Sequence, residues 1–405
     1  MNRRVVITGV GVVTPVGITR ERFWQSMKEG RSGIGQITTF DTDHYANARG
    51  GEIRDFKPET FLDGKDTDIL DRSTQLLHAA VLDAFDGTDF DPGFEDRFRS
   101  GVIVGTTTGA DSSNFHSKWN REGFDSILTE DVLRYRSDLI PNYISQRYRL
   151  KGPSLLVTNA CAAGTYAIGQ AMNLIRSGRA DFMIAGGTER MSDLAMCGFN
   201  ATRSLSSDEV RPFDKLRKGL LLGEGAAVLF LETPEAATKR AAKIYGEVAG
   251  FGLSCDAAHM TSPMVGGEGA ALSMLEAIRD AGLSADDIDY ISAHGTGTAL
   301  NDRMETNAVK RVFGERAYRI PMSSIKSMIG HTLGASGAIE AAACAMILET
   351  GIIPPTINYT EKDADCDLYY VPNKAAEARV NTILSNSYAF GGNNASIILR
   401  RFENE

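Results

Sequence analysis

The sequence predicts an α/β protein built from two similar halves, and two observations carry this prediction. Short runs of β-branched residues alternate along the 405 residues with longer segments of helical periodicity, the pattern of parallel strands joined by helices. A weak internal repeat also relates the first part of the chain to the second at a constant offset of 173 residues. Both features favour paired sheets with helices packed against them.

The elements are expected in a regular order from the N-terminus. A buried first strand begins near Val5, because Gly9 and Gly11 interrupt the apolar run too early for a signal peptide or a membrane-spanning helix. Helices are expected over residues 20–29 and 72–85, followed by a strand over 102–104. Glycine-rich turns are expected to close several strands, where open α/β sheets bind ligands, at residues 104–105, 184–187 and 293–298.

The repeat is clearest in two alanine-rich segments, residues 162–178 and 335–351. Each opens with small residues, continues as an apolar helix and ends in a glycine suited to a C-cap. Because small and apolar residues cover the whole circumference, we expect these helices to be buried between sheets. The halves are expected to meet near residue 243, which divides the chain into residues 1–242 and 243–405.

Composition disfavours several classes of protein. The chain has 43 Lys and Arg against 52 Asp and Glu, a net charge of −9, which argues against nucleic acid as a partner. Its five cysteines form no C-x-x-C pair, so we expect free thiols in the reducing cytoplasm rather than disulfides or a zinc ribbon. No metal-ligand spacing is found, and Gly9-Val10-Gly11 lacks the third glycine of a dinucleotide fingerprint. No metal, cofactor or membrane is therefore expected.

One cysteine lies where nucleophilic chemistry is favoured. Cys161 stands at the junction of an apolar strand and the first alanine-rich helix. The N-terminus of a helix stabilises a thiolate and can lower its pKa below the free value of about 8.5. Cys161 is therefore a candidate nucleophile, although this segment alone fits a small buried core residue equally well.

Two histidines shift the balance toward a nucleophile. His294 ends a strand in His-Gly-Thr-Gly-Thr, and His331 precedes the second alanine-rich helix. If the halves are related by a pseudo-two-fold axis, the two matching helices start at the same central cleft, so Cys161 and His331 converge there. Lys326 could organise the surroundings of His331 through a charge partner such as Glu340, with a solvated surface pair as the alternative.

Taken in order, the motifs resemble the β-ketoacyl-acyl carrier protein synthases, in particular the elongating type II group with a Cys-His-His site. The resemblance covers essentially the whole chain. It implies a thiolase-type fold, a five-layer αβαβα arrangement of two similar halves, usually as a homodimer. The matching segments are residues 4–15, 159–164, 211–214 with 223–226, 259–263, the two histidine motifs and Phe390-Gly391-Gly392.

The resemblance implies an acyltransferase that carries out a decarboxylative Claisen condensation on substrates held by acyl carrier protein. Cys161 would take the growing acyl chain as a thioester, and the backbone N–H groups of Cys161 and Phe390 would form the oxyanion hole. His294 and His331 would stabilise the enolate formed when malonyl-acyl carrier protein loses CO2, so that the chain grows by two carbons. The other implied site residues are the organising pair Lys326 and Glu340, the pantetheine contacts Thr296 and Thr298, the acyl-gate residues Phe199 and Phe390, and Thr108 in the acyl pocket.

The sequence departs from the family pattern in places that affect substrate choice. The usual Phe-Gly-Phe-Gly-Gly-Thr-Asn loop reads Tyr-Ala-Phe-Gly-Gly-Asn-Asn over residues 388–394, and Ala389 should stiffen it. Thr106-Thr107-Thr108 makes the expected pocket lining polar. These changes favour a polyketide or aryl-polyene type pathway with unsaturated or oxidised chains over housekeeping fatty-acid elongation. Acidic Asp66 and Asp68 replace expected basic residues, so carrier-protein docking would use Arg203, Arg217 and Lys218 instead.

Two rival functions remain to be weighed. A thiolase would need a second cysteine in the loop over residues 388–394, which has none. A chain-length or binding subunit of a heterodimeric ketosynthase would lack the nucleophile, so Cys161 argues against that role. Pairing of an active chain with a related subunit, in place of a homodimer, stays open.

Overall fold

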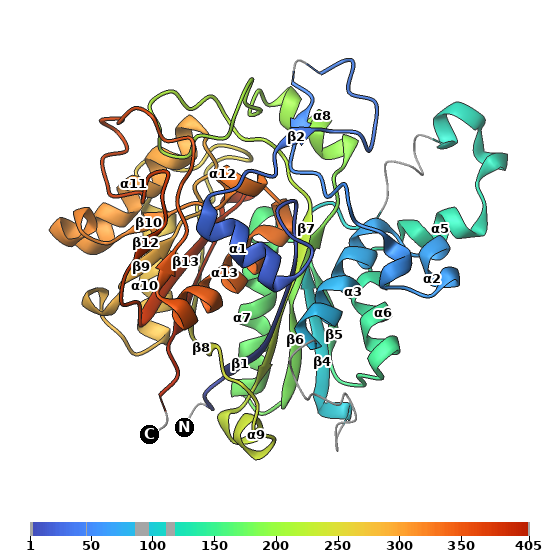
Figure 1. The fold of residues 1–405 in the computed structure, drawn as a ribbon, viewed down its shortest axis with the longest axis horizontal. Helices are drawn as coiled ribbons and strands as arrows, with labels where there is room; N and C mark the ends of the chain where they lie inside the picture. The colour runs from blue at the N-terminus through green and yellow to red at the C-terminus, as the bar shows by residue number, and fades with distance from the viewer. Residues whose placement is uncertain (1–2, 46, 86–96, 111–117, 404–405) are drawn as a thin grey trace.

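The computed structural model contains a sheet of ten strands, and the strand arrangement of one half of this sheet repeats in the other half (Figure 1). The structure describes residues 3–45, 47–85, 97–110 and 118–403. From one edge to the other, the strands are β10 (Met322–Ser323), β9 (Tyr290–Ser292), β13 (Thr382–Tyr388), β14 (Asn393–Arg400), β8 (Gly246–Cys255), β1 (Val6–Val13), β7 (Gly225–Glu232), β6 (Phe182–Glu189), β4 (Ser100–Gly105) and β5 (Ser154–Val157).

The sheet consists of two half-sheets of identical connectivity. Strands β5, β4 and β6 run parallel, and β7 and β1 follow antiparallel. Strands β10, β9 and β13 are likewise parallel, and β14 and β8 follow antiparallel. The two half-sheets are hydrogen-bonded to each other where β1 meets β8, through the pairs Val6 with Glu247 and Ile7 with Gly246. The predicted repeat therefore corresponds to strand order, while the boundary near residue 243 stays a prediction.

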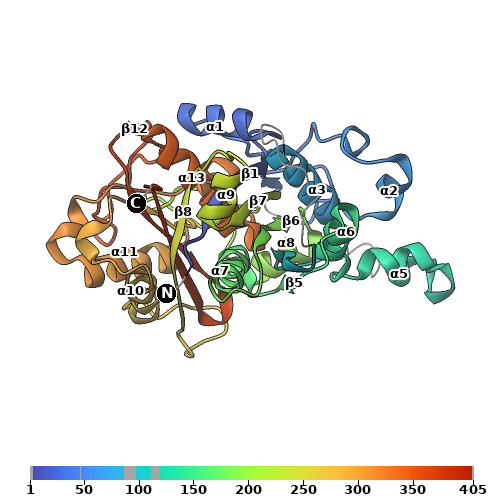
Figure 2. The same ribbon diagram turned by 90° about the horizontal axis from the view of Figure 1, so that it is seen from below.

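Helices cover and separate these half-sheets (Figure 2). One apolar core joins the two inner helices to both half-sheets, and each half-sheet has a second core on its other face, where it packs against its outer helices. The layers are therefore outer helices, half-sheet, inner helices, half-sheet and outer helices. The inner helices are α7 (Ala163–Arg176) and α13 (Ser336–Thr350), and the outer ones are α3 (Arg72–Phe85) and α6 (Leu139–Tyr148) on one side and α10 (Glu268–Asp280) and α11 (Ala299–Phe313) on the other.

The shorter elements lie around this body. They are helices α1 (Arg20–Glu29), α2 (Gly64–Ile69), α5 (Thr129–Tyr135), α8 (Asp193–Ala201), α9 (Pro234–Lys239) and α12 (Lys326–Ile329), and the strand pairs β2 (Gly35–Gln36) with β3 (Arg49–Gly50) and β11 (Ile352–Ile353) with β12 (Ala376–Glu377). The predicted helices over residues 20–29 and 72–85 are confirmed as α1 and α3.

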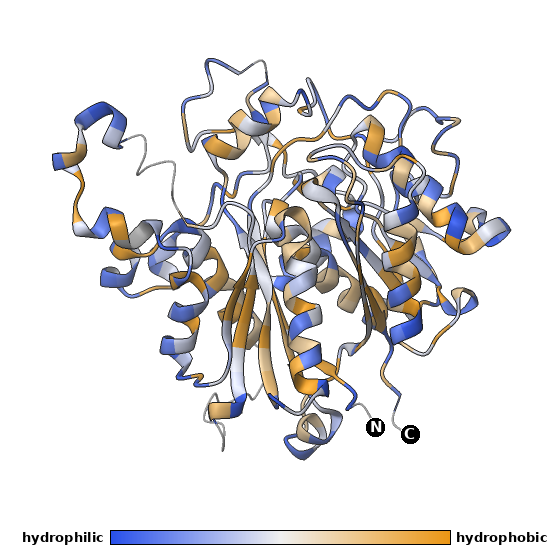
Figure 3. Cartoon of the chain, turned by 180° about the vertical axis from the view of Figure 1, so that it is seen from behind, coloured by the Kyte–Doolittle hydropathy of each residue, from blue (hydrophilic) through white to orange (hydrophobic). Residues whose placement is uncertain are grey.

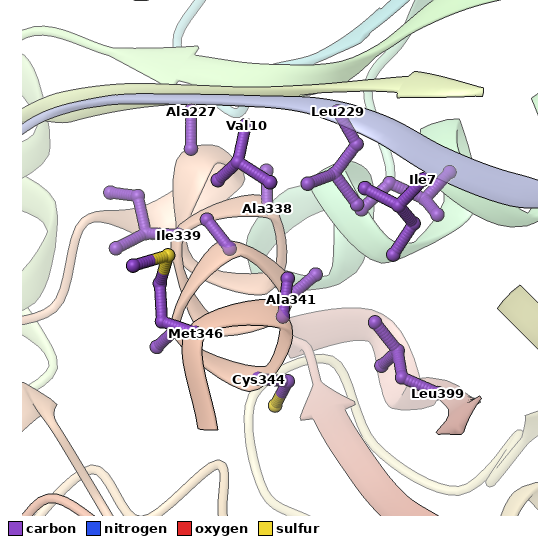
Figure 4. Packing of buried hydrophobic residues seen from close by; sticks show 14 of the residues in the cluster. Ile7, Val10, Ala227, Leu229, Ala338, Ile339, Ala341, Cys344, Met346 and Leu399 are labelled. Carbon is purple, nitrogen blue, oxygen red and sulfur yellow. The ribbon is translucent and has the colours of Figure 1, made fainter. Parts of the chain in front are cut away.

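Helix α13 is buried on every side, as its composition predicts. All of its residues from Ser336 to Leu348 are buried, and Ala338 and Ile339 face Val10 of β1 (Figure 4). The surrounding strands are coloured hydrophobic over much of their length (Figure 3). Among the described residues, one helical segment, Leu333–Thr350, is long and apolar enough to cross a membrane, and 89% of it is buried inside the protein.

Glycine allows close packing within two strands, and one sequence expectation about glycine was wrong. The first strand continues through Gly11, where an added Cβ would lie 1.8 Å from the carbonyl oxygen of Ala80 in α3. The stretch 184–187 is not a turn but the interior of β6. A Cβ at Gly187 would lie 2.8 Å from the carbonyl oxygen of Gly334, so glycine is needed there for the segment before α13 to pack closely against β6.

Helices α7 and α13 touch through glycine. A Cβ at Gly164 would lie 2.8 Å from the backbone nitrogen of Ala338 and 2.9 Å from the carbonyl oxygen of Gly334. A Cβ at Gly337 would lie 2.0 Å from the Thr165 hydroxyl oxygen. The two backbones therefore approach directly, and the segments that precede the helices are brought together.

We predict that Gly164→Ala destabilises the protein, because neither backbone neighbour can move aside without shifting a helix. Overpacking of this kind costs about 1–3 kcal/mol. Gly198→Ala is the matched control: Gly198 lies within α8, and no atom lies within 4 Å of its added Cβ. Chemical denaturation should show a loss for the first variant and no loss for the second. Equal stability of the two variants would contradict direct packing of α7 on α13.

Candidate active site

The inner helices begin with the same strained turn. Ala160 and Leu333, which lie 173 residues apart, both have a φ of 46°. L-residues rarely adopt this left-handed conformation, and it is costly for bulky side chains. Each starts a short 3-10 turn, Ala160–Ala162 before α7 and Leu333–Ala335 before α13. The turn before α7 carries Cys161, and the turn before α13 carries Gly334 in the matching place.

Cys161 is buried, with 5% of its surface exposed. Burial raises the pKa of its thiol to about 12, although Lys326 and the backbone N–H groups of Cys161 and Phe390 act in the opposite direction. The expectation of a lowered pKa was therefore wrong: removal of the sulfur from water outweighs the helix N-terminus. The backbone N–H groups of Cys161 and Phe390 thus lie beside the sulfur, and their role as an oxyanion hole stays a prediction.

His294 follows β9 in a loop that buried carboxylates hold in place. The Glu305 carboxylate accepts hydrogen bonds from the backbone N–H groups of His294 at 2.9 Å and Gly295 at 2.8 Å. Asp302 accepts the N–H of Gly297 at 3.1 Å. Gly295 and Gly297 have φ values of 38° and 82°, so the loop needs glycine at both positions. The imidazole is thus fixed by the backbone beneath it.

His331 reaches the same place from the segment between α12 and α13, in the same half of the chain as His294. Its N–H donates to the carbonyl oxygen of Leu221 at 2.7 Å, and its Nδ1 lies 3.1 Å from the Ser336 hydroxyl at the start of α13. The His294 and His331 rings are 5.4 Å apart between centroids and nearly perpendicular. The sequence prediction that His331 lies at the start of the second buried helix is confirmed.

Lys326 contacts both a buried carboxylate and one of the two site histidines. Its Nζ contacts the Glu340 carboxylate, and both side chains are buried, so the alternative of a solvated surface pair was wrong. Nζ also lies 3.4 Å from His294 Nδ1. Because an ammonium group only donates, a neutral His294 accepts at Nδ1 and carries its proton on Nε2. Burial, and then the Lys326 charge, lower the pKa of His294 and His331 well below the ordinary value, so both rings are neutral at pH 7.

These side chains line one cavity of about 330 Å³. Phe199 and Phe390 lie against each other there, with ring centroids 5.4 Å apart. The hydroxyls of Thr296 and Thr298 are 3.0 Å apart. The predicted site residues that line the cavity are Cys161, Phe199, His294, Thr296, Thr298, His331 and Phe390.

Two residues predicted to contact substrate or partner are engaged with carboxylates of the protein itself. Thr108 is not among the cavity residues; its N–H donates to Glu189 at 2.9 Å, and its hydroxyl contacts the same carboxylate. Arg217 borders the cavity but has only 6% of its side chain exposed and pairs with Asp363, so it is a poor docking residue for a protein. By contrast, Lys218 has 56% of its side chain exposed.

Sequence reasoning missed several lining residues. Thr261 and Ser262 lie in residues 259–263, a segment that resembles the family but for which the sequence predicted no role. Tyr388 and Asn394 lie in the glycine-rich loop, which signalled a close approach but not which side chains face inward. Asp256 had no signal in the sequence; its carboxylate accepts a hydrogen bond from Asn394 Nδ2 at 2.8 Å.

Comparison with known proteins identifies the family. The description "Beta-ketoacyl synthase, N-terminal domain" matches residues 2–237, and "Beta-ketoacyl synthase, C-terminal domain" matches residues 245–360. The chain belongs to the β-ketoacyl synthase family. Within it, the chain is an elongating ketosynthase, an acyltransferase of the 3-oxoacyl-[acyl-carrier-protein] synthase class.

The relatives match over their full length. The chain is 40% identical over 414 residues to 3-oxoacyl-[acyl-carrier-protein] synthase 2 of Coxiella burnetii, covering 98% of this chain and 99% of the relative. It is 41% identical over 407 residues to Nodulation protein E of a Rhizobium species, covering 99% of this chain and all of the relative. Among solved structures, the ishigamide ketosynthase/chain length factor superposes with a TM-score of 0.95 at 39% identity, and each chain is fully covered. The thiolase-type fold predicted from the sequence is thereby confirmed.

We predict that the Lys326 charge adds to burial in lowering the pKa of His294. The variant Lys326→Met with Glu340→Gln removes the cation without leaving a buried carboxylate unpaired. Removal of the Coulombic effect should raise the pKa of His294 toward its ordinary value, which NMR titration of labelled histidines measures. Buried His78, whose pKa of about 4 arises from burial and Arg147, is the internal control and should not change. An unmoved His294 would mean that burial alone sets its pKa.

Proposed function

We propose that the cavity carries out both steps of ketosynthase chemistry. In the first step, the Cys161 sulfur attacks the thioester carbonyl of an acyl-carrier protein, and the carrier thiol leaves with the proton. In the second step, malonyl-carrier protein loses CO2, and the resulting enolate carbon attacks the acyl-Cys161 carbonyl. A carbon–carbon bond forms, the carbon–sulfur bond breaks, and the thiolate of Cys161 takes up a proton.

One observation carries this proposal: Cys161, His294 and His331 line the same cavity, although they come from opposite halves of the chain. Two backbone N–H groups at the sulfur suit the tetrahedral intermediates. Two neutral imidazoles suit an enolate oxygen, because the proton of His294 is on Nε2. Lys326 and Glu340 act as positioning residues, since they do not line the cavity and Lys326 reaches it through His294.

The remaining predicted residues fit the handling of a carrier-bound substrate. We propose that Thr296 and Thr298 hydrogen-bond the pantetheine arm and that Phe199 and Phe390 gate the acyl chain. The partner is an acyl carrier protein, as in the solved complex titled a type II PKS acyl-carrier protein with its ketosynthase bound to the hexaketide, which superposes with a TM-score of 0.92 at 34% identity and complete coverage of both chains. Exposed Arg203 and Lys218 at the cavity are the docking residues that suit an acidic carrier protein.

The proposed acyl substrate is an unsaturated or oxidised chain. The threonine run no longer supports this preference, because Thr108 binds Glu189 instead of lining the cavity. Ala389 still does, since its loop lacks the glycine of the usual pattern. Five free thiols support a cytoplasmic location.

We predict that Cys161→Ala abolishes acylation by acyl-carrier protein, and that His331→Ala keeps acylation but loses condensation by at least 100-fold, the usual scale for a lost oxyanion donor. Intact-protein mass spectrometry follows acylation, and product analysis follows condensation. Saturated, unsaturated and β-oxidised chains are offered in parallel, and unsaturated or oxidised chains should load faster. Acylated Cys161→Ala would sink the nucleophile assignment, and normal condensation by His331→Ala would make that histidine structural.

We also propose a dimer formed through β5, with a second copy as the partner and a related chain-length subunit as the alternative. Strand β5 ends the sheet, and 47% of Leu155 on it is exposed. An uncovered apolar edge strand is a template for pairing with another chain. Helix α5 projects from the body (Figures 1 and 2), and Phe124, Leu128 and Val132 of this region are 68%, 57% and 46% exposed. Such surface favours an interface.

We predict a solution mass of twice 43.8 kDa for the purified chain. Leu155→Arg should give the mass of one chain, because a buried arginine without a partner opposes pairing. Leu272→Arg is the control, since Leu272 is 48% exposed on α10 at a distance from β5. Light scattering measures all three masses. A wild-type monomer that gains mass only with a related subunit would support the heterodimer, and an intact Leu155→Arg dimer would place the interface elsewhere.

A further inference from the structure

Tyr388 is a polar residue of the cavity wall whose chemistry the proposed reaction leaves unused. It ends β13, lines the same cavity as Cys161 and His331, and is 5% exposed. Its ring lies edge-on to that of His294, with centroids 5.6 Å apart. Its hydroxyl is closed off from water and has no hydrogen-bond partner among the described residues.

A buried hydroxyl without a partner costs about 1–3 kcal/mol, whereas phenylalanine of the same shape would avoid this cost. The Tyr388 hydroxyl therefore weakens the free protein. Native structures pair nearly all such groups, and exceptions concentrate at functional sites. Tyr370, in the same apolar core, shows the ordinary case, since its hydroxyl lies 2.8 Å from that of Thr306.

The surroundings make this hydroxyl a neutral donor. Burial, with the carboxylates of Glu305 and Asp256, raises the pKa of Tyr388 well above its ordinary value, so the oxygen keeps its proton. The Asp256 carboxylate on the same cavity wall disfavours a second carboxylate as the partner of this hydroxyl. A neutral carbonyl oxygen is the acceptor that suits a neutral donor beside His294.

We propose that the Tyr388 hydroxyl contacts substrate, donating a hydrogen bond to a carbonyl oxygen of the extender thioester while that thioester occupies the cavity beside His294. This inference rests on the proposed condensation. It makes Tyr388 a residue that favours the second step, because acyl transfer to Cys161 needs no donor at this position. Binding of the extender supplies the partner that the free protein lacks.

Tyr388→Phe tests this, with Tyr370→Phe as the matched control. In enzyme already acylated on Cys161, Tyr388→Phe should lower kcat/KM for malonyl-carrier protein roughly tenfold, the effect of one lost hydrogen bond. The rate of acylation should stay within about twofold. Thermal unfolding of the free enzyme should shift up by about 1–3 °C, because the unpaired oxygen is gone. Tyr370→Phe should unfold at a lower temperature and condense normally.

A higher unfolding temperature together with slower condensation distinguishes contact with substrate from a structural role, because loss of a structural hydrogen bond would lower the unfolding temperature. Unchanged condensation, or a lower unfolding temperature for Tyr388→Phe, overturns the proposal, since the hydroxyl would then be satisfied within the protein. Equal losses in acylation and condensation also overturn it, because they indicate a displaced ring in a shared cavity. Wild-type acylation and condensation are measured in the same series, and their absence would instead contradict the proposed function.

Discussion

The direct contact of α7 with α13 is the constraint on which the site depends. Cys161 and His331 lie 170 residues apart in the sequence and belong to different half-sheets. They share a cavity because each immediately precedes an inner helix, and because these helices approach backbone to backbone at Gly164 and Gly337. Larger residues at the crossing would separate the helix starts and therefore the reacting groups. Glycine at the crossing of α7 and α13 thus sets how far apart the Cys161 and His331 side chains lie in the cavity.

Electrostatics in this cavity is governed by burial more than by any single partner. A thiol, two imidazoles and a lysine–glutamate pair occupy one poorly solvated region, and burial drives the thiol and both imidazoles toward their neutral forms. The resting site therefore holds neutral reactive groups above the buried pair Lys326 and Glu340, where burial also raises the pKa of Glu340 to about 7. In the proposed reaction, negative charge develops on substrate oxygens, and backbone N–H groups and imidazoles already fixed in the cavity would stabilise it.

Much of this was predictable from the sequence, and the failures have physical causes. The offset repeat predicted both inner helices, and from these the meeting of Cys161 with His331. The rise in the pKa of Cys161 was not predictable, because a local helix start is visible in sequence whereas burial by distant elements is not. Thr108 was misplaced for a similar reason: its partner Glu189 lies 81 residues away. Gly186 and Gly187 were assigned to a turn, since glycine for flexibility and glycine for close packing look alike.

The paired strained turns at Ala160 and Leu333 alter how the nucleophile is understood. Both halves keep the same costly backbone, yet only one presents a thiol; in the other, the Gly334 N–H donates to Glu189 at 3.0 Å. The same costly backbone therefore carries a side chain to the cavity in one half and fastens itself to a buried carboxylate in the other. Equivalent positions of the repeat thus share their conformation without sharing their duties.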